Sequence, residues 1–168
     1  MNAYDHTLTW IKGELLEASW VLLFAAVTLL LAASFWKWGH TAGARALVLP
    51  FVLVGLVYCG VGSSLKISNN ARLKEYPARY EANPVQFAKA EKERIESFQY
   101  QYKISKTVAT VCFALTLLIF WFVKNPVWQG AGIGLSYFGL AGLVVDYFSE
   151  ERARIYYQAI LAALKSAS

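Results

Sequence analysis

Residues 83–123 read NPVQFAKAEKERIESFQYQYKISKTVATVCFALTLLIFWFV, and this stretch decides the fold. It opens with Asn83-Pro84, the pattern of a helix N-cap followed by proline at the first helical position. Charged residues continue to Lys106, and the remainder up to Val123 is apolar. We therefore predict one helix about 60 Å long at 1.5 Å per residue. Its second half crosses a membrane, and its first half stands in the cytoplasm.

Four uncharged stretches of the chain are each long enough to cross a hydrocarbon core of about 30 Å. The composition agrees with a membrane protein, because 57% of the residues are hydrophobic and only 16% are charged. The predicted fold class is all-α, a single membrane domain that comprises residues 1–168. The four predicted spans are residues 18–36, 46–65, 107–123 and 125–145.

The distribution of charges predicts the orientation of these spans. Only three basic residues, Lys37, Arg45 and Lys124, lie on one side, and all 11 acidic residues lie on the other. The positive-inside rule then places both termini and the second loop in the cytoplasm. The net charge of +5 is explained by basic residues at the inner leaflet, and it indicates no nucleic-acid partner. We predict a multi-pass membrane protein in contact with the membrane lipids.

The second loop is predicted to be structured rather than a linker. Residues 66–76 continue span 2 as a helix that ends before Pro77, and residues 77–82 form the turn. Together with the first half of the long helix they make a cytoplasmic helical hairpin over about 66–106. On the long helix, Ala88, Ile95 and Tyr102 repeat every seven residues beside Phe98. This apolar face is expected to pack on the hairpin's other arm or on a partner.

The chain ends in a second predicted cytoplasmic helix, over about 147–165. Its apolar positions are Phe148, Ile155, Tyr156, Ile160 and Leu164. Residues 2–17 resemble a short amphipathic helix, which either lies on the membrane surface or runs directly into span 1. The tight sequence Lys124-Asn125-Pro126 makes spans 3 and 4 antiparallel neighbours.

Few residues of the sequence indicate a catalytic or ligand-binding role. No zinc-protease, nucleophile-elbow or phosphate-loop motif occurs in the sequence, and we predict a protein that is not an enzyme and has no catalytic, cofactor or metal site. Gly130 and Gly134 form a small-xxx-small pair for close helix packing. Asp146 is a boundary acid that either pairs or caps locally or binds a ligand, and Glu150 and Arg154 are spaced as an i,i+4 pair. The predicted partner-binding residues are Ile95, Phe98, Tyr102, Gly130, Gly134, Asp146, Glu150 and Arg154.

The tail DYFSEERARIYY, residues 146–157, follows a glycine-rich fourth span. This C-terminal part resembles small four-span bacterial inner-membrane proteins that confer immunity to membrane-acting antibacterial toxins. The resemblance implies a protein partner, a toxin that the chain neutralises by direct binding.

Two other functions are compatible with the same sequence. A subunit of a small channel or transport assembly would form a homo-oligomer through span 2 or span 4. A membrane enzyme with a lipid substrate would bring Asp146, Glu150 and Arg152 together in one pocket.

Overall fold

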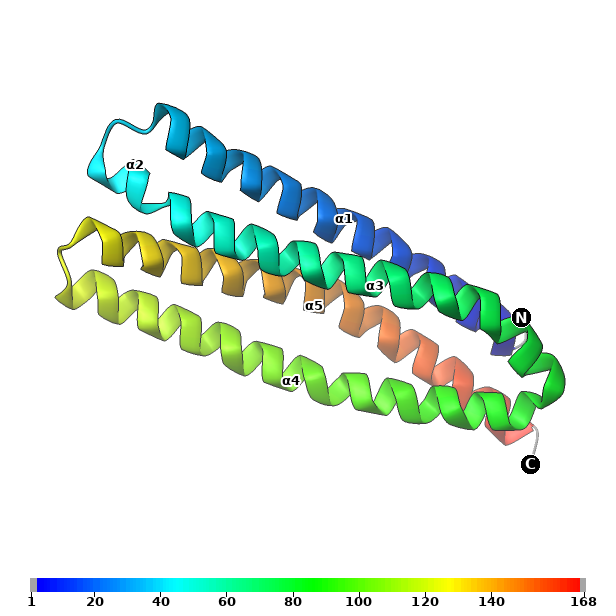
Figure 1. Ribbon diagram of the computed structural model, residues 1–168. Coiled ribbons are helices and arrows are strands. Elements are labelled where there is room, and N and C mark those ends of the chain that lie inside the picture. The colour runs from blue at the N-terminus through cyan, green and yellow to red at the C-terminus, as the bar shows by residue number, and fades with distance from the viewer. Residues whose placement is uncertain (1–2, 167–168) are drawn as a thin grey trace.

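The computed structural model describes residues 3–166, which form four long helices and one short helix (Figure 1). Residues 3–166 contain no strand, so the all-α prediction is confirmed. Each long helix is long and apolar enough to cross a membrane, as expected for a multi-pass membrane protein. The elements are α1 (Ala3–Trp38), α2 (Ala42–Ala46), α3 (Val48–Ala82), α4 (Pro84–Phe122) and α5 (Pro126–Ser166).

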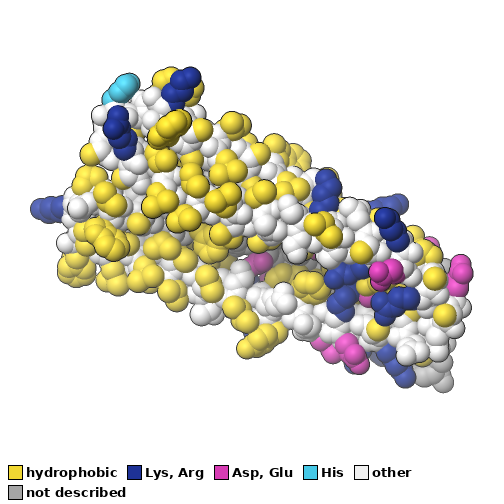
Figure 2. Space-filling model, viewed as in Figure 1, with side chains coloured by type: hydrophobic (Ala, Val, Ile, Leu, Met, Phe, Trp, Pro, Cys, Tyr) yellow, Lys and Arg dark blue, Asp and Glu magenta, His cyan; other side chains and the backbone are white. Residues whose placement is uncertain are grey.

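The long helices form two antiparallel hairpins that lie side by side (Figure 1). α1 packs along α3, α4 packs along α5, and α5 also contacts α1, α2 and α3. Both termini and the α3–α4 turn lie at one end of the bundle. Figure 2 shows that charged side chains gather over this end, whereas hydrophobic side chains cover the other. We call residues 3–17, 66–106 and 146–166 the charged half and the rest the apolar half.

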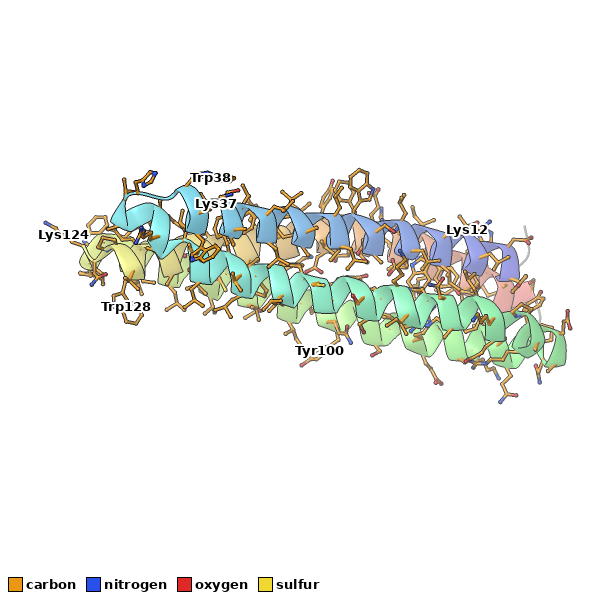
Figure 3. The ribbon with its side chains drawn as sticks, turned by 45° about the horizontal axis from the view of Figure 1, so that its top comes forward. Lys12, Lys37, Trp38, Tyr100, Lys124 and Trp128 are labelled. Carbon is orange, nitrogen blue, oxygen red and sulfur yellow. The ribbon has the colours of Figure 1, made fainter. Side chains whose placement is uncertain are left out.

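Aromatic and basic side chains mark the two ends of the apolar half. In Figure 3, Lys37, Trp38, Lys124 and Trp128 lie at the end with the short loops, and Tyr100 lies farther along the bundle toward the charged end. Trp38, Trp128 and Tyr100 are all exposed. Exposed tryptophan and tyrosine next to lysine are typical of the two membrane–water interfaces.

The start of the long helix is as the sequence predicts. The side chain of Asn83 accepts a hydrogen bond of 2.9 Å from the backbone N–H of Gln86, and Pro84 opens α4. α4 then continues without a break to Phe122. The predicted N-cap and the single long helix are therefore confirmed.

The predicted turn at residues 77–82 is wrong, because α3 continues through Pro77 to Ala82. A proline inside a helix costs about 3 kcal/mol or more. Ring contacts offset this cost: the rings of Tyr76 and Tyr80 meet Phe87 edge-on at 5.1 and 5.6 Å, and Tyr80 stacks on Tyr4 at 5.2 Å. Only Asn83 separates α3 from α4.

The buried face of α4 was predicted better than the buried face of α5. Ala88, Ile95 and Tyr102 of α4 are buried, as expected. On α5, however, Phe148 and Ile155 are exposed. The buried positions there are Ser149, Ala153, Tyr156 and Ile160, which recur at spacings of four, three and four and face the other helices.

Candidate functional site

A buried hydrogen-bond network connects all four long helices in the charged half. The carboxylate of Glu91 on α4 accepts bonds from the hydroxyls of Tyr76 on α3, at 2.6 Å, and Tyr156 on α5, at 2.7 Å. Arg94 also donates to it through Nε at 3.0 Å. The hydroxyls of Tyr156 and Thr7 on α1 lie 2.7 Å apart. We call these five residues the Glu91 lock.

The electrostatics of the lock keep Glu91 ionised. Burial alone favours the neutral acid, but the hydrogen bonds and charge of Arg94, with the two tyrosine hydroxyls, hold the pKa of Glu91 below its usual value. The Arg94 guanidinium also lies 4.4 Å from the ring centroid of Trp10, which stacks on Tyr156 at 5.3 Å. Because Glu91 is only 3% exposed and its carboxylate already binds three donors, the lock is structural.

A second charged cluster joins α1 to α5 at the boundary between the two halves. Arg152 donates from Nη2 to Glu14 at 3.2 Å, and it also pairs with Glu17. Burial raises the pKa of Glu14 above its usual value although Arg152 lies beside it. Two carboxylates thus share one guanidinium.

Beside this cluster, α1 and α5 diverge and leave a groove of about 630 Å³. Glu17 and Arg152 line it where it meets the charged half, and nearly all of the remaining lining is apolar. Trp20 and Phe148 are largely exposed at this groove, so it opens at the side of the bundle. This α1–α5 groove is further lined by Phe24, Tyr137, Leu140, Ala141 and Val144.

A smaller groove of about 350 Å³ lies among α3, α4 and α5. Its walls are mostly apolar, and Asp146 lines it at the boundary with the charged half. We call it the α3–α4 groove; its lining includes Val57, Val61, Gln101, Ile104 and Val108.

Three of the predicted partner-binding residues lie in the chain's own core. Ile95 and Tyr102 are buried, and the hydroxyl of Tyr102 lies 3.0 Å from the Ser149 hydroxyl. Phe98 packs against Trp10 with ring centroids 6.4 Å apart. The apolar face of α4 therefore packs within the chain at these positions.

The glycine pair also packs internally. A Cβ atom added at Gly130 would lie 2.6 Å from the carbonyl oxygen of Ala46, and one at Gly134 would lie 2.4 Å from Cβ of Pro50. The predicted close packing is therefore present, and it fits α5 against α2 and the start of α3. These glycines form no exposed face for oligomerisation.

The polar candidates on α5 do not converge, because Arg152 lies on another side of the helix than Asp146 and Glu150. Glu150 pairs with Lys106 of α4 at 2.6 Å, and not with Arg154 as the i,i+4 spacing suggested. Asp146 lines the α3–α4 groove, whereas Arg152 lines the α1–α5 groove. Arg154 is exposed. The single pocket of Asp146, Glu150 and Arg152 that a lipid enzyme would need is therefore not formed.

Sequence reasoning missed the burial of Glu91, the pairing of Arg152 with Glu14 and Glu17, and both grooves. Glu91 did carry a local signal, because it lies three residues after Ala88 and four before Ile95, on the predicted buried face of the long helix. Glu14 and Glu17 carried one too: they are three residues apart, on one helix face, immediately before an apolar span.

The raised pKa of Glu14 gives a prediction for Glu14→Gln. At neutral pH the buried, ionised carboxylate of Glu14 destabilises the folded state. This destabilisation is lost as the pH falls through the raised pKa of Glu14. Because Glu17 still pairs with Arg152, we expect Glu14→Gln to be as stable as the wild type or up to about 1 kcal/mol more stable at pH 7. The difference should vanish at low pH. Thermal unfolding in detergent from pH 7 down to 4.5 measures it, and a variant less stable at pH 7 would contradict the assignment.

Comparison of the chain with protein-family models, curated proteins and solved structures gave no match.

Proposed function

We propose that this chain is a non-enzymatic binding protein of a bacterial inner membrane, with its charged half in the cytoplasm. The observation that carries the proposal is the α1–α5 groove, a cavity of about 630 Å³ with almost wholly apolar walls that opens sideways. A groove of this kind between spans accepts an apolar helix by close packing. The proposed ligand is therefore a membrane segment of a protein partner.

The proposed partner is an antibacterial toxin that acts on the membrane, and the proposed role is immunity. Holding one apolar segment of such a toxin in the α1–α5 groove keeps that segment from assembling into a pore. The rigidity of the charged half supports this role, because the Glu91 lock and the Arg152 cluster fix α1 and α5 on either side of the groove. A preformed groove costs less ordering free energy on binding.

Deletion of the gene in its native host tests the immunity role. We expect the deletion strain to be killed by wild-type siblings in co-culture, and plasmid-borne wild-type protein to restore survival. Equal growth of both strains, under conditions in which the siblings express their toxins, would overturn the proposed function.

Two matched variants test the groove itself. Val144→Trp fills the groove from its half-exposed rim, whereas Leu117→Trp adds the same ring on the exposed surface of α4. We expect Leu117→Trp to protect the deletion strain and Val144→Trp to fail, with both proteins present in the membrane at equal levels. A photo-crosslinking residue at Leu140 should capture the toxin's apolar segment, and one at Leu117 should not. Full protection by Val144→Trp would retain the immunity role and reject the groove as its site.

A further inference from the structure

The α3–α4 groove contains one acidic group whose partners are incomplete. Asp146 lies at the boundary between the apolar and charged halves, and it lines this groove with Ser105 and Gln101. Ser105 interacts with the carboxylate. The Oδ2 atom of Asp146 is buried, and within residues 3–166 it has no hydrogen-bond partner. A carboxylate oxygen left in this state costs free energy that a suitable donor would recover.

Lys106, whose charge acts on Asp146, does not fill this gap. Lys106, which lies one residue after Ser105 on α4, has its Nζ 2.6 Å from Oε2 of Glu150. The carboxylate of Asp146, whose pKa burial raises, therefore lines the groove with no ion pair of its own in the part of the chain that the structure describes.

The rest of the groove is suited to a hydrocarbon chain. From Asp146 its walls continue into the apolar half along Val57 and Val61 of α3 and along Val108 and Ala109 of α4. At about 350 Å³ the groove is large enough for a ligand rather than a packing defect. Its polar end stands at the depth of the lipid headgroups, and its apolar end at the depth of the acyl chains.

We propose that the α3–α4 groove binds a phospholipid with a primary ammonium headgroup, of the phosphatidylethanolamine type. The ammonium donates hydrogen bonds to the Asp146 carboxylate, and one acyl chain lies along the apolar walls. A charge-assisted bond of this kind favours the primary ammonium over two alternatives. A trimethylated headgroup has no N–H to donate, and an anionic headgroup meets a like charge. Gln101 lines the same polar end and supplies an amide for the phosphate.

Native mass spectrometry of the purified, delipidated chain tests this inference with dioleoyl lipids of three headgroups. We expect phosphatidylethanolamine to bind about tenfold better than phosphatidylcholine or phosphatidylglycerol. Asp146→Asn should remove this preference. Glu151→Gln also replaces a carboxylate by an amide, but at an exposed position of α5, and it should keep the preference. Equal binding of the three lipids to the wild type, or an unchanged preference in Asp146→Asn, would overturn the inference.

A second variant tests the contribution of the apolar walls separately from that of the Asp146 carboxylate. Val108→Trp fills the apolar walls and leaves Asp146 in place, so the bound phosphatidylethanolamine should fall by about tenfold as well. If this variant binds the lipid like the wild type, the headgroup contacts Asp146 without the acyl chain entering the groove, and the proposed site is wrong. Circular dichroism of each variant checks that the helices are retained.

Discussion

Glu91→Ala is expected to destabilise the folded chain by about 3–5 kcal/mol, the cost of removing one partner of a buried ion pair. The substitution leaves Arg94 without its counterion, although the aromatic rings around the guanidinium remain. It also removes the acceptor of the Tyr76 and Tyr156 hydroxyls. At about 2–4 °C per kcal/mol, the midpoint of thermal unfolding in detergent should fall by roughly 10 °C.

Two further variants make this prediction specific to the buried pair. Glu93→Ala removes an exposed carboxylate two residues away and should change the midpoint by less than about 2 °C. Glu91→Leu combined with Arg94→Met removes both charges and should recover much of the lost stability, because no uncompensated charge remains. A midpoint for Glu91→Ala equal to that of Glu93→Ala would show that the lock contributes nothing.

Gly130→Ala is expected to destabilise the apolar half by about 1–3 kcal/mol, as for other residues that overfill a packed interior. The added Cβ would lie 2.6 Å from the carbonyl oxygen and 2.8 Å from the carbonyl carbon of Ala46. These are backbone atoms, so α5 and α2 must move apart. The same thermal unfolding measurement in detergent detects the loss.

Gly60→Ala is the matched control, since a Cβ at Gly60 meets nothing within 4 Å. Alanine is the better helix former by about 0.5–1 kcal/mol, so this variant should be as stable as the wild type or slightly more stable. If both alanine variants raise the midpoint, the close approach of α5 to α2 does not form in the membrane protein.

The two packing predictions also bear on the proposed binding surface. Because Ile95, Tyr102, Gly130 and Gly134 are all used inside the chain, we expect the proposed partner to contact other residues. The grooves on either side of α5 meet this requirement, and Tyr58 and Val145 line both of them. Each of the two proposed ligands would therefore contact Tyr58 and Val145, which also border the other groove.

The sequence by itself determined the long helices, apart from the end of α3, which continues past Pro77. The span lengths, the N-cap at Asn83 and the tight turn before Pro126 depend on residues within a few positions of each other, and local physical rules read such patterns reliably. The seven-residue repeat of Ala88, Ile95 and Tyr102 likewise showed which face of α4 is buried. Membrane insertion reinforces these signals, because each span must satisfy its own backbone hydrogen bonds.

Only the tertiary structure decided which surfaces meet. Arg152 reaches Glu14 and Glu17 across more than 130 positions of the chain, and Tyr156 reaches Glu91 across 65. Helix periodicity places Glu91 on the same face as Ala88 and Ile95 and Glu93 on another, but the Tyr76 and Tyr156 hydroxyls that bind Glu91 come from other helices. The two grooves also depend on the tertiary structure, because the divergence of two helices depends on the sizes of side chains brought together from distant segments.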